Sequence, residues 1–321
     1  MSRWSTALDQ CGISDPALRR DYGLQRSAVR RFAPAEYLAV RLLLPPRLHP
    51  SVVAAVAFMH ETDERIDSGE TSARQAALRS WDEQVTAALG QQVRAEQPAL
   101  PVLRALADTA RRHPFMATRV RDFLDGAPTE VAWSGFDTED AFQAYVDSYS
   151  LPALMLTASL LELSPSADKL TFRDGCRTLI EAMQRIDFLA DLSEDAAEGR
   201  IGVPCDTLAR FGLDTTDLTR GSGDHLPAVE RLVTAQARLA ASALDSCRDL
   251  PHLVEPEQQP FLETLIAVQH LRLRDVERRG AALLTHGARP DVLATVGLLV
   301  RQHRAARRRR RRRPGPRRQS G

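Results

Sequence analysis

Residues 184–195 read QRIDFLADLSED, and this stretch of the 321-residue chain decides the fold. Asp187, Asp191 and Asp195 recur every four residues, a spacing that places the three carboxylates on one face of an α-helix. Leu189 and Leu192 lie between them and fall on another face. The stretch therefore predicts a helix with one buried side and one densely acidic side.

A second acidic pair ends an earlier apolar segment. Residues 60–67 read HETDERID, so Asp63 and Asp67 are also four residues apart. Two like charges at this spacing repel each other and cost stability unless a cation lies between them. Carboxylate oxygens are ligands of hard cations such as Mg²⁺, which binds a few carboxylates, waters and substrate phosphates. The alternative is an ordinary solvated helix end, with Arg65 as the nearby cation.

Apolar residues recur at helical spacing along most of the chain, as at Leu179, Met183 and Ile186. Runs of Val, Ile and Thr that alternate as in strands are absent from the sequence. Glycines and prolines fall between the periodic segments, where loops between helices are expected. We predict an all-α protein, with an N-terminal extension at 1–24, one helical domain at 25–300 and a disordered tail at 301–321.

The composition excludes several classes of protein. With 43% hydrophobic residues the chain can bury a large core, which excludes disorder of the whole chain. Residues 301–321 hold 11 arginines, so the rest of the chain has 32 basic and 42 acidic side chains, a net charge of −10. Because this acidic body would repel a polyanion, we expect no nucleic-acid partner. From the arginines of the tail we predict at most weak contact with an anionic membrane surface.

Targeting signals and cysteine spacing indicate where the protein is located. The sequence has no signal-peptide layout and no apolar run approaching the length of a bilayer span, so we expect a cytoplasmic protein. The four cysteines lie far apart, which indicates neither a zinc site nor a disulfide framework. The oligomeric state does not follow from the sequence.

The two acidic stretches resemble the motifs of the squalene/phytoene synthase family. Residues 44–67 resemble its layout of Leu-Pro, then a helix, then Thr-Asp-Glu-x-x-Asp. Residues 184–204, followed by LARFG at 208–212, resemble its run QxxNxxRDxxEDxxxGRxYxP followed by a Leu and a Phe-Gly. Gly126 and Tyr145 lie in the matching region between them, so the resemblance covers roughly residues 25–285.

The resemblance implies an isoprenoid synthase fold, a single-domain helical bundle with a central apolar cavity between two Asp-rich helices. It also implies that Mg²⁺ bound between these helices neutralises the diphosphate leaving an allylic isoprenyl diphosphate. The implied metal ligands are Asp63, Asp67, Asp187, Asp191 and Asp195. Guanidinium groups bind phosphate oxygens in pairs, and the implied diphosphate-binding residues are Arg200, Arg41 and Arg272.

Several positions depart from the family pattern. His60 stands where the family usually has Arg, and Val56 stands where it often has Tyr. In the second motif Asp187 replaces Asn and Ala190 replaces Arg, so the site gains an acid and loses a cation. Gly202 replaces the Tyr that follows the family's Gly-Arg pair.

A further departure concerns the path of the prenyl chain. The family has an Ala-Gly-x-x-Gly stretch that lets a long chain pass close to the helix backbone. Residues 149–153 instead read YSLPA. Tyr149 and Pro152 should therefore reshape the tunnel and shorten it.

The departures indicate either drift in an ordinary synthase or a repurposed site. We interpret them as a repurposed site, similar to the squalene-synthase-like prenyltransferases that attach a short prenyl group to a carbazole-type ring. The predicted function is Mg²⁺-dependent transfer of a prenyl group, from a donor such as dimethylallyl diphosphate, to a small aromatic acceptor in secondary metabolism. The alternatives are a head-to-head squalene or phytoene synthase and a terpene cyclase. Retention of all five motif aspartates argues against a non-catalytic assembly partner.

The sequence leaves open which group takes the proton lost from the acceptor ring. His60, Tyr149 and a motif carboxylate are the candidates for this catalytic role, and packing roles fit His60 and Tyr149 equally well. The expected substrate pocket contains Val56, Ser150, Ala153, Gln184, Phe188 and Gly202.

Overall fold

The computed structural model describes residues 3–90, 100–220, 223–288, 294–295 and 297–304. Within these ranges the chain forms helices and one isolated antiparallel bridge, between Leu163 and Val254, which confirms the predicted all-α fold. The first half contains α1 (Arg3–Gln10), α2 (Pro16–Phe32), α3 (Pro34–Leu43), η1 (Pro46–Leu48), α4 (His49–Ile66), α5 (Thr71–Gly90), α6 (Pro101–Arg112) and α7 (Met116–Ala132). The second half contains α8 (Glu139–Tyr145), η2 (Val146–Ser150), α9 (Leu151–Ala158), α10 (Lys169–Ala190), α11 (Leu192–Ala197), α12 (Cys205–Arg210), α13 (Thr215–Arg220), η3 (Gly223–His225), α14 (Leu226–Ser246), η4 (Cys247–Leu253), α15 (Gln259–Arg279) and η5 (Gly280–Leu284).

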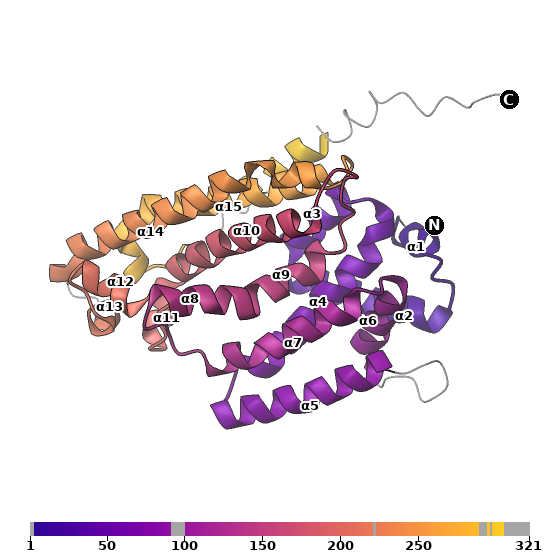
Figure 1. The fold of residues 1–321 in the computed structure, drawn as a ribbon, viewed down its shortest axis with the longest axis horizontal. Coiled ribbons are helices and arrows are strands. Elements are labelled where there is room, and N and C mark those ends of the chain that lie inside the picture. The colour runs from indigo at the N-terminus through magenta and orange to yellow at the C-terminus, as the bar shows by residue number, and fades with distance from the viewer. Residues whose placement is uncertain (1–2, 91–99, 221–222, 289–293, 296, 305–321) are drawn as a thin grey trace.

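The helices lie on either side of a central path made by α8, η2 and α9 (Figure 1). On one side α10 packs against α9 and η2, and is itself covered by α14 and α15. On the other side α7 packs against η2 and α9, with α5 along the outer edge. α4 contacts α9 as well as α2, α5 and α6. The central path therefore contacts both α4 and α10, and the two acidic motifs lie at the C-terminal ends of these helices.

Local sequence signals begin many of these helices. Proline occupies one of the first two helical positions in α2, α3, α4, α6, α9, α14 and α15, where its missing N–H costs nothing and its fixed φ favours the helix. The side chains of Asp15, Thr138 and Asp168 accept hydrogen bonds from backbone N–H groups in the first turns of α2, α8 and α10. These caps fix the starts of helices whose ends carry the candidate site.

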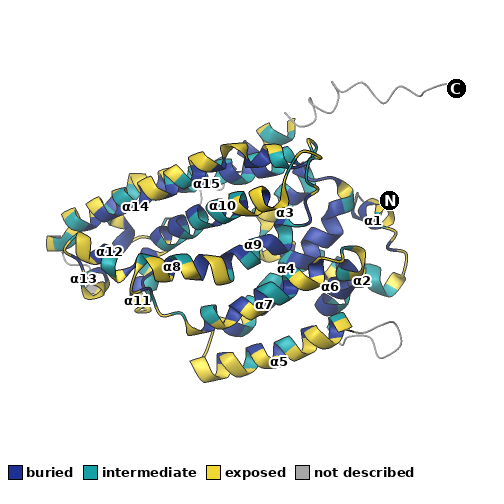
Figure 2. Ribbon diagram, in the orientation of Figure 1, coloured by how far each residue is buried: buried dark blue, intermediate teal, exposed yellow. Residues whose placement is uncertain are grey.

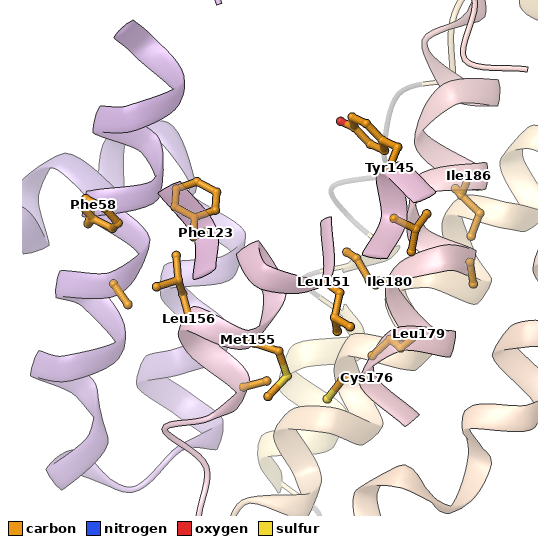
Figure 3. Packing of buried hydrophobic residues seen from close by; sticks show 14 of the residues in the cluster. Phe58, Phe123, Tyr145, Leu151, Met155, Leu156, Cys176, Leu179, Ile180 and Ile186 are labelled. Carbon is orange, nitrogen blue, oxygen red and sulfur yellow. The ribbon is translucent and has the colours of Figure 1, made fainter. Parts of the chain in front are cut away.

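Apolar side chains line the inner faces of the long helices, as the burial pattern shows (Figure 2). In the centre, Met155 and Leu156 of α9 lie between Phe58 and Phe123 on one side and Leu179 of α10 on the other (Figure 3). None of the helices in the described ranges combines the length and the hydropathy needed to cross a membrane. The core therefore fixes α9 between the two motif helices.

The structure places the predicted segment boundaries inside helices. The boundary at residue 25 falls within α2, and the buried Tyr22 of that helix donates a hydrogen bond to Asp108 Oδ2 of α6 at 3.0 Å. Residues 3–24 thus include α1 and the first half of α2, which is bonded to α6 through Tyr22. Residues 297–304 are helical, with His303 Nδ1 2.9 Å from the carbonyl oxygen of Leu42. The rest of the predicted tail, from residue 305, lies outside the described residues.

Candidate active site

The first acidic motif lies at the C-terminal end of α4. Asp63 is half-buried in the last turn, and Asp67 caps the helix with its N–H bonded to the Asp63 carbonyl. The hydroxyl of Tyr149 donates a hydrogen bond to Asp63 Oδ1 at 3.0 Å. Burial, reinforced by the nearby charges of Asp67 and Glu130, raises the pKa of Asp63 to about 7 against the effect of this hydrogen bond. Burial also raises the pKa of Asp67.

The second acidic motif spans a break between two helices rather than one continuous helix. α10 ends at Ala190, Asp191 connects it to α11, and Asp195 follows in the first turn of α11. The break has a physical cause, because the backbone N–H of Ala288 donates to the Ala190 carbonyl at 2.8 Å. The N–H of Glu194, which would reach that carbonyl in a continuous helix, donates to the Asp191 carbonyl instead.

The acids of the second motif differ in their surroundings. Asp187 forms an ion pair with Arg272 of α15, so the extra acid of this motif is matched by a cation. Burial still raises the pKa of Asp187, with Arg272 opposing the shift. Burial and the Asp191 charge raise the pKa of Asp195 to about 7, and Arg200 opposes the shift. The pKa of Asp191 is raised by burial and by Glu194.

Arg200 connects the two motifs electrostatically. Its positive charge opposes the burial-driven rise in the pKa of both Asp67, at the end of α4, and Asp195, in α11. The guanidinium forms an ion pair with Glu198 and lies over the Trp133 ring, 5.5 Å from its centroid. The structure therefore brings the two acidic ends and the predicted Arg200 to one locus.

Two further residues at this locus were missed by sequence reasoning. Glu130, near the end of α7, accepts a hydrogen bond from the Tyr145 hydroxyl at 2.5 Å. Burial raises the pKa of Glu130, Asp67 raises it further, and the charges of Arg74 and Arg200 oppose the shift. Arg74 is buried and donates to the carbonyl oxygens of Ile66 and Glu130, which joins the ends of α4 and α7. A single acid or arginine within a helix carries no motif, so the sequence offered no signal for either residue.

The predicted arginines do not all reach the site. Arg41 Nη1 lies 2.6 Å from His49 Nδ1, at the opposite end of α4 from Asp63, and the guanidinium stacks over Trp4. Asp63 follows His49 by fourteen positions on α4, which corresponds to about 21 Å along the helix axis. The structure therefore places Arg41 away from the first motif, in contact with His49 and Trp4.

The catalytic candidate His60 and the residues expected to line the pocket lie on several elements, namely α4, η2, α9 and α10 and the loop after α11. His60 stacks on Phe32 of α2 with ring centroids 3.6 Å apart, and its Nε2 lies 3.9 Å from Glu64 Oε1. Val56 and Ala153 are partly buried and pack on the core, and Ser150 is buried. Gln184 is half-buried on α10, one turn before Phe188.

Phe188 and Gly202 meet at the second motif. Phe188 stacks on Trp133 with ring centroids 5.2 Å apart and also contacts the rings of Phe136 and Tyr145. A Cβ atom at Gly202 would lie 2.1 Å from Cγ of Phe188. The Phe188 ring therefore occupies the space that any side chain at position 202 would enter.

The oxygen donors of the two motifs fit a hard divalent cation. They are carboxylates, and the pKa values of Asp63 and Asp195 are raised first by burial and further by neighbouring acids, so a bound cation would stabilise their charged forms. Within the described ranges no three His, Cys, Asp or Glu side chains gather tightly enough to hold a metal ion by themselves. Mg²⁺ does not need such a cage, because it keeps waters and uses substrate phosphates as ligands.

Comparisons with known proteins agree with this geometry. The sequence pattern described as squalene/phytoene synthase matches residues 30–297. A bifunctional protein CrtB/UppS from Streptomyces coelicolor is 31% identical over 278 residues, which are 86% of this chain and 47% of that protein. A phytoene synthase from Arthrospira platensis is 29% identical over 221 residues, covering 65% of this chain and 70% of its own length. This chain thus spans about half the length of the first relative.

Solved structures share the fold. A dehydrosqualene synthase in complex with a ligand superposes with a TM-score of 0.76 at 22% identity, covering 91% of this chain and 98% of that one. Squalene synthase HpnC from Alicyclobacillus acidocaldarius superposes with a TM-score of 0.72 at 22% identity, covering 84% and 98%. With the family pattern matched from residue 30 to residue 297, this chain belongs to the squalene/phytoene synthase family.

Proposed function

We propose that this chain is a Mg²⁺-dependent prenyltransferase that ionises a short allylic isoprenyl diphosphate and transfers the prenyl group to an aromatic acceptor. The specific acceptor that we propose is a molecule with a carbazole-type ring. The observation that carries the proposal is the hydrogen bond from Tyr149 to Asp63. It puts an aromatic ring beside a motif carboxylate, in the stretch that the family keeps small for a long prenyl chain.

The diphosphate would lie between the ends of α4 and α10. Asp63 and Asp67 on one side, and Asp191 and Asp195 on the other, would hold Mg²⁺, which when bound neutralises the leaving diphosphate. Arg200 would bind phosphate oxygens, since its charge already acts on both motifs. The arginine that the family carries at the position of Ala190 is missing, and Arg272 is paired with Asp187. These features favour one diphosphate rather than two.

A series of aromatic rings supports a short donor. Phe58 and Phe123 lie 6.0 Å apart between ring centroids, Phe123 and Tyr149 5.6 Å, and Tyr149 and Tyr145 5.7 Å. The series runs from α4 through α7 to η2 and α8, directly beside Asp63. Ring faces stabilise a carbocation without supplying a nucleophile. We expect a short prenyl cation to lie beside Tyr149, because this residue stands in the stretch that the family keeps small for a long chain.

A second ring cluster supports an aromatic acceptor. Trp133 and Phe188 stack at an angle of 26° beside the second motif, and Arg200 lies over Trp133. Flat ring faces of this kind pack favourably against a planar acceptor. A ring carbon of the acceptor then attacks the allylic carbon, the C–O bond to diphosphate breaks, and the ring proton leaves to a base.

The second candidate function is head-to-head condensation of two long allylic diphosphates. It is favoured by the similarity to proteins named phytoene synthase, one of them 29% identical over 221 residues. The two candidates differ in the number of diphosphates held at once and in the need for an acceptor.

A product assay separates them. Purified full-length chain is incubated with Mg²⁺ and allylic diphosphates of five to twenty carbons, with and without a panel of carbazole-type and other electron-rich aromatics. A chain carrying both Asp63→Ala and Asp191→Ala is the blank, and Asp125→Asn, an exposed acid of α7, is the matched control. The proposal expects diphosphate release and a new product with a short donor only when an acceptor is present. A C30 or C40 hydrocarbon from a long donor alone would replace it with the second candidate.

A further inference from the structure

The central helical path contains one widened turn. Residues 146–150 form a π-helical turn between α8 and α9, in which the N–H of Leu151 donates to the Val146 carbonyl five residues earlier. Pro152 explains the turn, because it has no N–H for the Ser148 carbonyl and its ring would clash with that carbonyl in a regular α-helix. Turns of this kind occur frequently at functional sites.

The widened turn packs on the backbone of α7 at one position. A Cβ atom at Gly126 would lie 1.9 Å from the Ser148 carbonyl oxygen and 3.3 Å from the Tyr149 Cα. Only glycine permits this approach. Glu130 is one turn further along α7, so the contact at Gly126 brings Glu130 against the same turn.

Two tyrosines at the ends of this turn hold two carboxylates. Tyr145 and Tyr149 have ring centroids 5.7 Å apart, and their hydroxyls donate to Glu130 of α7 and Asp63 of α4. Burial raises the pKa of both phenols, so each remains a hydrogen-bond donor at neutral pH. Each bond involves one oxygen of its carboxylate, and the second oxygen of Asp63 has no bond to Tyr149.

We propose that the turn at 146–150 is a positioning device for the divalent cation: Tyr149 orients Asp63, and Tyr145 orients Glu130, which makes Glu130 a carboxylate of the active centre outside both motifs. The inference rests on the proposed function only in taking a divalent cation and diphosphate as ligands. It also changes the interpretation of Tyr149, whose proton is already donated to Asp63, from a catalytic base to a positioning residue.

The expected effect follows from how metal ligands are oriented. A hydrogen-bonded partner fixes the direction in which a ligating carboxylate presents its free oxygen, and loss of such a partner typically costs about 10- to 100-fold in metal affinity or activity. Glu130 adds negative charge where Asp67, Arg74 and Arg200 meet, so it offsets the two cations that would otherwise weaken cation binding at Asp67.

Metal binding tests the proposal without any prenyl donor or acceptor. Calorimetry measures the affinity of the full chain for Mg²⁺ in the presence of inorganic pyrophosphate, for wild type, Tyr149→Phe, Tyr145→Phe and Glu130→Gln. Tyr22→Phe is the matched control, because it removes a buried tyrosine hydroxyl of α2 that donates to Asp108 of α6, away from the site. Melting temperatures of all variants show whether each one folds.

The proposal expects Tyr149→Phe to weaken Mg²⁺ binding at least about 10-fold. Tyr145→Phe should weaken it because Glu130 loses its hydrogen-bond donor. Glu130→Gln should weaken it because the amide still accepts from Tyr145 but the negative charge is lost. Tyr22→Phe should lower only the melting temperature. Unchanged Mg²⁺ affinity in folded Tyr149→Phe and Glu130→Gln would overturn the proposal. Because the assay lacks an acceptor, this result is independent of whether the acceptor is aromatic.

Discussion

The ring of Phe188 on α10 stands directly over Gly202, so close that a Cβ there would lie 2.1 Å from its Cγ. An aromatic group that the family pattern places on the loop after Gly-Arg is thus supplied from the neighbouring helix. Because α10 is packed by α9, α14 and α15, the ring is held by a rigid element instead of a loop.

The Phe188–Gly202 relationship predicts a strongly non-additive pair. Gly202→Tyr should lower the melting temperature and abolish product formation, because no space remains beside Phe188. Phe188→Gly combined with Gly202→Tyr should recover folding, because even the Phe188 Cβ would lie 2.5 Å from the added Cβ, and removing the whole side chain lets the new ring take the place of the old one. A double-mutant cycle from thermal unfolding measures the coupling. If Gly202→Tyr alone were as stable as wild type, the two positions would not share that space.

Arg200 and Arg41 should respond differently to the same substitution. Arg200→Gln should raise the KM for the prenyl diphosphate by about 10-fold or more, because hydrogen bonds to charged groups contribute about 1.5–3 kcal/mol. Arg41→Gln should leave KM unchanged and lower stability, since Arg41 contacts His49 at the end of α4 opposite to Asp63. Steady-state kinetics of diphosphate release checks both. Equal effects on KM would contradict the placement of Arg41.

Gly126→Ala should disturb the site through the backbone. The added methyl group would meet the Ser148 carbonyl, and we expect a loss of about 1–3 kcal/mol in the free energy of unfolding, as for other overpacked positions. Gly23→Ala is the matched control, because Gly23 also lies within a helix but has nothing within 4 Å of the added atom. Gly23→Ala should be stabilising by up to about 1 kcal/mol. Urea unfolding of both variants would refute the argument if they behaved alike.

His49 should make the protein sensitive to acid. Burial, with Arg41 nearby, lowers the pKa of His49 to about 4, below the ordinary value of 6.5. The unfolded chain then binds the proton more readily than the folded chain does. The contribution of neutral His49 to the free energy of unfolding is therefore complete above pH 6.5 and is lost as the pH falls from 6.5 through 4. The shift corresponds to about 3 kcal/mol.

The measurement is urea unfolding between pH 7.5 and 4, on wild type and His49→Gln. The glutamine amide can still donate to the Leu44 carbonyl, which lies 3.1 Å from His49 Nε2. We expect a shallower loss of stability with acid in the variant. Parallel curves for the two proteins would show that His49 does not titrate as stated.

Both acidic motifs could be predicted from the sequence because their logic is local. Spacing by four residues places Asp63 with Asp67, and Asp187 with Asp191, whatever the rest of the chain does. The break at Asp191 could not be predicted, since it depends on a hydrogen bond from Ala288, almost a hundred residues later.

Other parts of the site depend on contacts between distant segments. Arg200 stood in a matched segment and was predicted, whereas Arg41 was one of 42 arginines with nothing in the sequence to exclude it. Glu130 had no patterned neighbours, so only its bond to Tyr145 reveals it. The filling of the Gly202 space by Phe188 needs the packing of α10 against the loop after α11.

The widened turn beside α7 also corresponds to a pattern in the amino-acid sequence. Gly126 and Glu130 are four residues apart, and so are Tyr145 and Tyr149, with Pro152 three residues later. Gly126 and Glu130 contact the turn and Tyr145 respectively, and Tyr149 bonds to Asp63. The five residues together therefore make a fingerprint that can be recognised from the sequence alone. Searching genomes for chains that keep this fingerprint would sort the family by the residues that orient the metal-binding carboxylates instead of by overall sequence identity. Chains that retain the acidic motifs but lack the fingerprint should hold their cation by a different arrangement.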